Sequence, residues 1–197
     1  MRPLWAFVTD FGDSGVTLPL ASLVFLFLLL AREWLVARAW VVSVVGCAVV
    51  IGGLKLVFGA CGPSLPLAGI ESPSGHTAMS VMIYLSFARL LSGGMSRRAA
   101  NIIFLGGVLL VAGIAVSRIV IQVHDLAEVL VGVAVGVVAH AGFSWMLAAK
   151  RTIALPHAAL AISALVLVAA LHGTRLNVEP RLYHIATWLR FAVPWCR

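Results

Sequence analysis

Three short groups of polar residues interrupt an otherwise strongly apolar sequence, and their residue types suit chemistry on a phosphate ester. Polar and charged groups beside a lipid bilayer are costly, so histidines, cations and a carboxylate at the ends of apolar segments indicate a functional site. The groups are Lys55 with Pro63, Pro73-Ser74-Gly75-His76, and Ser117-Arg118 with His124 and Glu128.

The third group contains a histidine and a carboxylate that are suited to act together. His124 and Glu128 are spaced i, i+4 at the start of an expected helix, so their side chains are expected on the same face. Glu128 can accept the proton of one imidazole nitrogen, fix the tautomer and leave the other nitrogen to attack phosphorus. His76 can then protonate the departing oxygen and later activate water. Asp125 is a second candidate to orient a histidine.

The second group suits the binding of an anion. Ser74 and Gly75 form a turn that leads directly into an apolar segment, and the start of a helix presents free backbone N–H groups to a phosphate. Lys55 and Arg118 are expected at the closing ends of two other helices, on the same membrane face. Two cations can therefore converge on that phosphate.

The composition indicates an integral membrane protein. The chain has 197 residues, of which 62% are hydrophobic and 11% are charged, and this does not describe a soluble globular domain. Six windows lie between consecutive charged residues, and each can supply a helix close to the ~20 residues that a bilayer requires. They span residues 14–31, 39–54, 72–88, 99–117, 129–149 and 152–174.

These windows predict an all-α, six-helix membrane bundle that forms a single domain over residues 1–197. The first segment follows Asp10 and Asp13 rather than a basic stretch, which favours a retained helix over a cleaved signal peptide. The stretch 59–72 is rich in Gly and Pro and is expected to be a loop. The expected helices span approximately residues 15–31, 38–57, 75–91, 99–117, 124–149 and 152–173, followed by a tail over 174–197.

Charge asymmetry predicts the orientation, because Lys and Arg near helix ends tend to remain in the cytoplasm. The turns after the first, third and fifth helices carry Arg32, Arg38, Arg89, Arg97, Arg98, Lys150 and Arg151, opposed by Glu33 alone. The cations on the other side are largely offset by acidic residues. Both termini and all three polar groups are therefore expected to face outward. The net charge of +7 follows from this asymmetry and gives little support to a nucleic-acid partner.

In order and spacing, the three groups resemble the three-part signature of the type 2 phosphatidic acid phosphatase (PAP2) superfamily. The resemblance implies a PAP2-like fold and a phosphatase that needs no metal or other cofactor. It also implies a phosphohistidine on His124, with His76 as general acid. The resemblance further implies that Lys55, Ser74, Gly75 and Arg118 hold the phosphoryl group. The residues that match the three parts of the signature are, in order, Lys55 followed after six residues by Gly62-Pro63, then Pro73-Ser74-Gly75-His76, and finally Ser117-Arg118 with His124 and Glu128.

Two positions depart from the family pattern. Similar proteins usually have Arg where this chain has Gly62, and Asp where it has Glu128. The missing cation matters because each cation aimed at the transferring phosphoryl group can contribute several kcal/mol in the transition state. The tail over residues 175–197 has helical spacing of apolar residues and suits an amphipathic helix in the membrane interface. We expect Arg190 or Arg197 from this tail to replace the missing arginine.

The cysteines allow the tail to be attached covalently. Cys47 lies inside the second expected helix and suits a small packing residue, whereas Cys61 and Cys196 are both expected outside, where disulfides persist. A Cys61–Cys196 bond would hold the tail over the site, with two free thiols as the simpler alternative.

A lipid phosphate or diphosphate is the expected substrate, because a head group at the membrane surface lets its chain stay in the bilayer between helices. An outward-facing site in a bacterial inner membrane suits undecaprenyl diphosphate, with phosphatidylglycerol phosphate and phosphatidic acid as competitors. The expected partners are this substrate and membrane lipids, and the sequence does not indicate an oligomeric state.

Three alternatives remain open. A phosphotransferase would share the fold and pass the phosphoryl group to a lipid or sugar hydroxyl. A weakened phospholipid-binding homologue is consistent with Gly62 and Glu128. A transporter would be expected to place ionisable groups near the bilayer midplane.

The other histidines lack the spacing of a metal pair, and packing or interfacial roles are favoured for His140, His157 and His172.

Overall fold

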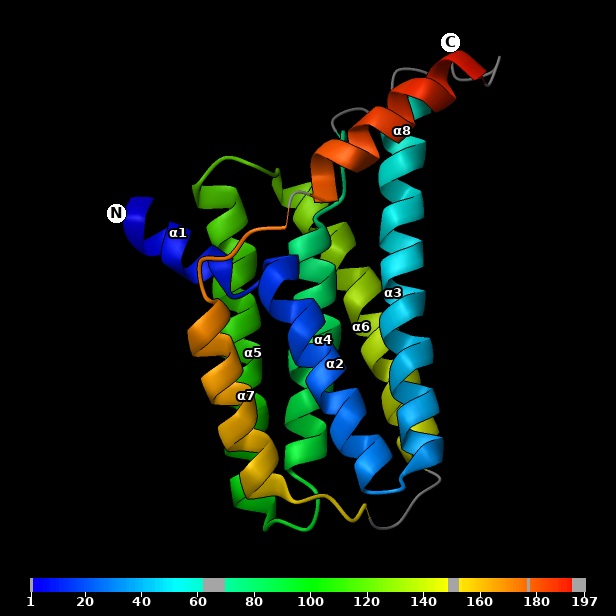
Figure 1. The fold of residues 1–197 in the computed structure, drawn as a ribbon. Helices are drawn as coiled ribbons and strands as arrows, with labels where there is room; N and C mark the ends of the chain where they lie inside the picture. Colours follow the sequence, from blue (N-terminus) through cyan, green and yellow to red (C-terminus); the bar gives the residue numbers. More distant parts are fainter. Residues whose placement is uncertain (1, 62–69, 149–152, 177, 193–197) are drawn as a thin grey trace.

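The computed structural model describes residues 2–61, 70–148, 153–176 and 178–192. Within these ranges the regular secondary structure is entirely helical (Figure 1). The helices are α1 (Arg2–Asp10), α2 (Ser14–Leu30), α3 (Trp34–Cys61), α4 (Gly75–Leu91), α5 (Arg97–Val120), α6 (Leu126–Ala148), α7 (His157–Leu171) and α8 (Val178–Ala192).

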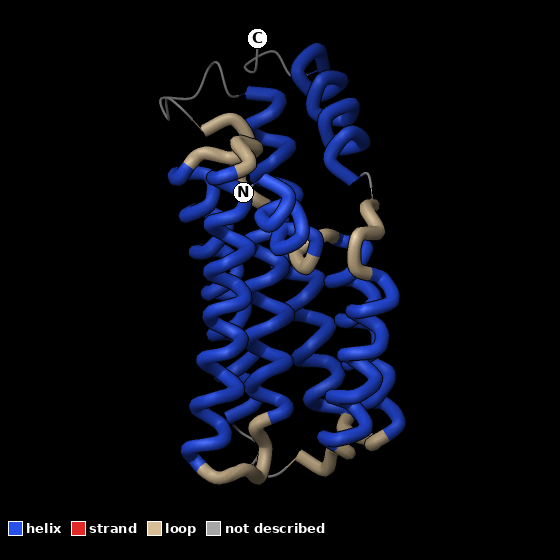
Figure 2. The backbone as a smooth tube through the Cα atoms, turned by 90° about the vertical axis from the view of Figure 1, so that its left-hand side faces the viewer, coloured by secondary structure: helices blue, strands red, loops and turns tan. Residues whose placement is uncertain are grey.

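Helices α2 to α7 run alternately up and down, so their connections fall at two opposite ends of the bundle (Figures 1 and 2). One end carries α1, α8, the segment 70–74 before α4 and the turn between α5 and α6; we call it the α8 end. Because α3 and α5 finish there and α4 and α6 begin there, the described residues of all three polar groups lie at the α8 end.

The six expected helices correspond to α2–α7, with several changes of boundary. Helix α3 continues to Cys61 instead of ending near residue 57, so Lys55 lies inside the helix and residues 59–61, which were expected in a loop, are helical. The extension packs against α8: Ala60 and Cys61 are buried with Leu189 beside them. Helix α7 begins at His157 rather than at 152, directly after Pro156, whose ring and missing N–H oppose helical continuation before it. Helix α1 was not predicted.

Four helical stretches within the described residues are long and apolar enough to cross a membrane: Pro3–Leu30, Trp34–Cys61, Arg97–Val120 and Leu126–Ala148. Six helices were expected to cross the membrane, and four stretches meet this criterion of length and composition. Helix α7 is apolar but has 15 residues, and α4 has 17.

Helix α4 is the centre of the bundle and packs against α2, α3, α5 and α6. Every residue from Thr77 to Ser86 is buried. Helices α3, α5 and α6 instead expose many large apolar side chains on the outer surface, as expected for segments that face lipid.

Two glycines let α6 approach α4 closely at the α8 end. A Cβ atom added at Gly132 would lie 2.5 Å from the backbone oxygen of Ser74, and one at Gly136 would lie 2.5 Å from Cβ of Val81. Glycines spaced i, i+4 allow backbones of membrane helices to come together. The segment that leads into α4 is therefore held directly against the first turns of α6.

Candidate active site

The His124 imidazole and the Glu128 carboxylate form a buried pair. Nδ1 of His124 lies 2.7 Å from Oε2 of Glu128, and the two side chains are only 4% and 7% exposed. Between the two carboxylates that could orient the imidazole, the structure selects Glu128, because the side chain of Asp125 is exposed. With Nδ1 hydrogen-bonded to the carboxylate, Nε2 is the nitrogen suited to attack.

His124 is positioned by the end of α5 rather than by α6. Helix α6 begins at Leu126, so the expectation that His124 lies inside this helix is wrong. Helix α5 ends in a Schellman motif, with Gln122 in the left-handed region at φ 60°. The backbone N–H groups of Val123 and His124 both donate to the carbonyl of Arg118, at 3.2 and 3.3 Å. This cap places the histidine beside the arginine.

The Glu128 carboxylate also organises the segment before α4. Its Oε1 accepts hydrogen bonds from the backbone N–H groups of Glu71 at 2.9 Å and Ser72 at 2.6 Å. The backbone N–H of Ser74 donates to the carbonyl oxygen of Glu128 at 3.1 Å. Several donors directed at one carboxylate favour its charged form, which is the form that can accept the imidazole proton.

Burial lowers the pKa of the His124 imidazole below its usual value, and the positive charges of Arg118 and Lys55 lower it further, whereas the hydrogen bond to Glu128 opposes the shift. A lowered pKa keeps the imidazole neutral, and a nucleophilic nitrogen must be neutral to attack phosphorus.

The residues expected to bind an anion, Lys55, Ser74 and Gly75, lie together at the start of α4. Nζ of Lys55 donates to Oγ of Ser72 at 3.1 Å, and a Cβ atom added at Gly75 would lie 3.2 Å from Cε of Lys55. The ammonium group is therefore beside the first N–H groups of α4, which have no acceptor within the helix. Oγ of Ser74 is the N-cap and accepts from the N–H of Thr77 at 3.4 Å, so its hydroxyl supports the turn itself.

Arg118 is held by a residue that the sequence did not indicate. It is 6% exposed in the last turn of α5, and its Nη1 donates to Oγ1 of Thr9 in α1 at 3.1 Å. Helix α1 packs against α5. This packing brings together two residues that are 109 positions apart in the sequence.

His76 also has a partner that was not predicted. Its Nε2 lies 3.4 Å from Oδ2 of Asp13, with side-chain exposures of 17% for the histidine and 9% for the carboxylate. Asp13 precedes the first apolar segment and is the N-cap of α2. That capping position was visible in the sequence, but no local pattern connects it to a histidine in α4.

The tail forms the expected helix, α8, which packs against the end of α3. Arg190 lies on α8 with an exposed side chain. Gly62 and Arg197 lie outside the described residues, so the replacement of the missing arginine stays a prediction.

The described cysteines differ in state. Cys61 is disulfide-bonded, whereas Cys47 is free and buried. Cys196 lies outside the described residues, so its pairing with Cys61 also stays a prediction.

His140, His157 and His172, for which packing or interfacial roles were predicted, each contact another segment of the bundle. His140 connects α6 to α4 through a 2.9 Å hydrogen bond between its Nδ1 and Oγ of Ser86. His172 is hydrogen-bonded to the carbonyl of Phe7 at 2.9 Å, and the ring of His157 lies against Gly93. Among the described residues, no group of three or more His, Cys, Asp or Glu could hold a metal ion.

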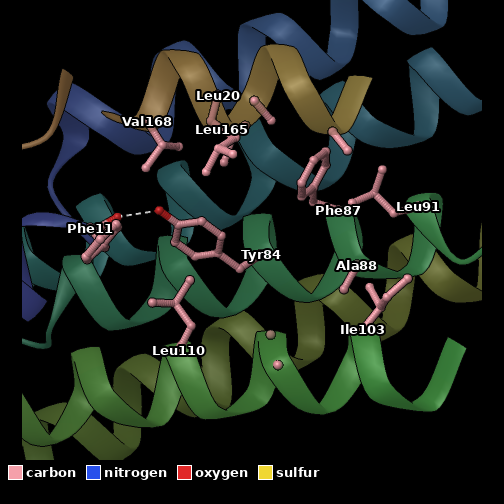
Figure 3. A pocket seen from close by; sticks show the side chains of 14 residues that line it. Phe11, Leu20, Tyr84, Phe87, Ala88, Leu91, Ile103, Leu110, Leu165 and Val168 are labelled. Atoms are coloured by element: carbon pink, nitrogen blue, oxygen red, sulfur yellow. Dashed lines mark hydrogen bonds between the residues drawn. The ribbon is translucent and has the colours of Figure 1, made fainter. Parts of the chain in front are cut away.

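An apolar cavity of about 320 Å³ lies between α2, α4, α5 and α7 (Figure 3). Small residues such as Gly106, Gly107 and Ala164 leave this space open. At the end nearest the polar groups, the hydroxyl of Tyr84 donates to the carbonyl of Phe11 at 2.6 Å. The lining is otherwise hydrocarbon and suits an alkyl chain.

Comparison with known proteins found a family match and a relative. The model of the PAP2 superfamily matches residues 60–152, a range that contains His76, Arg118, His124 and Glu128. A protein of Klebsiella pneumoniae described as "Uncharacterized 22.5 kDa protein in cps region" is 30% identical over 155 residues, covering 75% of this chain and 70% of the relative. No solved structure matches the chain.

Proposed function

Since the chain belongs to the PAP2 superfamily, we propose that it is an integral-membrane phosphatase that hydrolyses a lipid phosphate or diphosphate. The observation that carries this proposal is the buried 2.7 Å contact between His124 and Glu128. Beside it lie Lys55, Arg118 and the N-terminus of α4, which together suit one phosphoryl group.

In the proposed reaction, Nε2 of His124 attacks phosphorus. Nδ1 keeps its proton and donates it in a hydrogen bond to the Glu128 carboxylate. An N–P bond forms, and the bond between phosphorus and the lipid oxygen breaks as His76 gives that oxygen a proton. Water then attacks the phosphohistidine. His76 takes a proton from the water, the N–P bond breaks and inorganic phosphate leaves. Lys55, Arg118 and the N–H groups of Gly75 and His76 stabilise the charge on phosphorus in both steps.

We infer a lipid substrate from the surroundings of the site. The polar groups lie at one end of the bundle, while the apolar cavity extends away from them between α4, α5 and α7. A phosphate head group held at the membrane surface lets its hydrocarbon chain stay in the bilayer. Undecaprenyl diphosphate and the phospholipid phosphates, phosphatidylglycerol phosphate and phosphatidic acid, are the proposed candidates.

We propose that α2–α7 all cross the bacterial inner membrane and that the α8 end faces the periplasm or exterior. The opposite end carries Arg32, Arg38, Arg89, Arg97 and Arg98, and cations near helix ends favour the cytoplasm. The exposed aromatic side chains of Tyr183, Trp188 and Phe191 on α8 suit the interface between lipid and water.

Phosphate release from a panel of esters tests the proposed function. The full chain in detergent, with a metal chelator present, is expected to hydrolyse at least one of undecaprenyl diphosphate, phosphatidylglycerol phosphate and phosphatidic acid, and to leave a soluble sugar phosphate intact. Hydrolysis of the sugar phosphate alone would contradict the lipid assignment. Activity that disappears with chelator and returns with a divalent cation would contradict the histidine mechanism.

Gly132→Ala tests whether the close contact between α4 and α6 holds the reacting groups in register. The added methyl group would lie 2.5 Å from the backbone oxygen of Ser74, so the segment before α4 must shift relative to Glu128. We expect turnover to fall about ten- to a hundred-fold, because displacements near 1 Å have effects of this size. Gly142→Ala on the same helix, where an added Cβ meets nothing within 4 Å, is the control and should keep normal turnover. Equal activity of the two variants would argue against this role of Gly132.

A further inference from the structure

Building on the proposed function, we propose that Asp13, which lies directly before α2, is the positioning residue of His76. The site would then contain two imidazole–carboxylate pairs with different tasks. Glu128 orients the nucleophile His124, and Asp13 orients His76, which moves protons to and from the substrate oxygens.

The two oxygens of Asp13 have separate contacts. Oδ1 accepts from the backbone N–H groups of Gly15 at 2.8 Å and Leu176 at 3.0 Å. Oδ2 is the oxygen that faces Nε2 of His76, at 3.4 Å. Because Oδ1 is held by two backbone donors from different segments, the carboxylate cannot rotate freely, and Oδ2 has a defined direction toward the imidazole.

The turn that carries Asp13 is itself fixed against α4 and α5. The carbonyl of Phe11 accepts the hydroxyl of Tyr84 at 2.6 Å. A Cβ atom added at Gly12 would lie 2.7 Å from Cγ2 of Ile114 and 3.0 Å from Oγ of Ser80, so this turn fits tightly between the two helices. Asp13 also caps α2 with φ −65° and ψ 147°. The carboxylate therefore has a rigid support.

The chemistry of His76 requires such a partner. A general acid must point its proton at the lipid oxygen as that oxygen departs, so the direction of the imidazole ring has to be fixed. An anion on Nε2 also orients the ring, so that the proton on the other nitrogen can be delivered to the leaving oxygen. Asp13 acts only through His76 and does not touch the substrate.

Asp13→Asn is the test, because asparagine caps a helix as well as aspartate and preserves the shape of the side chain. With dodecyl phosphate, whose alkoxide needs a proton to leave, we expect kcat to fall about 10- to 100-fold. With p-nitrophenyl phosphate, whose phenolate leaves readily, the loss should be below about 3-fold. Asp10→Asn is the matched control: Asp10 lies in the same turn but binds Arg175 at 2.9 Å, and this variant should match the wild type on both esters.

A double-mutant cycle separates positioning from a general structural effect. In a His76→Ala background, Asp13→Asn should change the rate by less than about 2-fold, because the residue through which it acts is absent. Equal losses on both esters, equal effects of Asp13→Asn and Asp10→Asn, or an undiminished effect without His76 would each overturn the proposal.

Nitrogen-15 NMR of histidine-labelled full chain in detergent gives a readout that does not need turnover. The ring nitrogen shifts of His76, assigned through His76→Ala, should move in Asp13→Asn and stay unchanged in Asp10→Asn. Unchanged shifts in Asp13→Asn would overturn the role of Asp13. If the wild type hydrolysed no phosphate ester, the proposed function would fail on its own, and the NMR comparison would still decide whether Asp13 holds His76.

Discussion

Replacement of His124 by alanine is expected to abolish phosphate release, with turnover at least about a thousand-fold below that of the wild type. The variant lacks the nitrogen that forms the N–P bond, and the neighbouring groups can bind and polarise the phosphate but cannot replace this bond. Lys55, Arg118 and the start of α4 remain in place, so substrate binding should persist.

The measurement uses a lipid phosphate labelled with phosphorus-32. Wild-type protein quenched during turnover should carry an acid-labile, alkali-stable label, and His124→Ala should carry none. His184→Ala is the control, because His184 is an exposed histidine on α8, and its loss should leave both label and turnover unchanged. A labelled His124→Ala protein, or one with near-normal turnover, would place the nucleophile elsewhere.

Glu128→Gln is expected to lower kcat by about 10³- to 10⁴-fold while KM changes by less than about 3-fold. Glu128 is surrounded by donors: Glu71 and Ser72 donate to Oε1, and His124 Nδ1 lies against Oε2. Glutamine offers one acceptor oxygen. If that oxygen keeps the two backbone bonds, its NH₂ group faces Nδ1 and favours the tautomer in which Nε2 carries the proton and cannot attack.

Two variants make the Glu128 result specific. Asp125→Asn removes the exposed carboxylate beside His124 and should retain turnover within about 2-fold of the wild type, since exposed charges interact weakly. Glu128→Asp keeps the charge with a shorter side chain and should recover part of the activity lost in Glu128→Gln. Near-normal turnover in Glu128→Gln, or a comparable loss in Asp125→Asn, would remove Glu128 from its role as the orienting acid.

The pair of His124 and Glu128 shows what could be predicted from sequence. Their spacing predicted contact, and the contact is present at 2.7 Å even though His124 precedes helix α6 instead of lying within it. The cap at the end of α5 substitutes for the expected helical turn. A contact between residues four positions apart depends on only a few residues of chain. The i, i+4 spacing therefore predicted the contact between His124 and Glu128 correctly, although it did not predict where helix α6 begins.

The N-terminal turn shows where sequence was insufficient. Thr9 contacts Arg118, 109 positions along the chain, and Asp13 faces His76 from before the first long helix. Both residues could be recognised as polar positions that precede an apolar segment, and Asp13 as a helix cap. Their partners depend on how α1 and α2 pack against α4 and α5.

The sequence by itself determined the membrane class, the approximate helix positions, the residues that suit phosphoryl chemistry and the resemblance to a family. These follow from composition, from the length of apolar windows and from local spacing. Only the tertiary structure decided which donors hold Glu128, which carboxylate faces His76 and which residue holds Arg118. The physical reason is that helices such as α3 and α7 are apolar on nearly all sides, so their patterns carry little information about which face turns inward. The rotation and packing of the helices are set by close contacts such as that of Gly132 with Ser74, which appear only when the bundle is assembled.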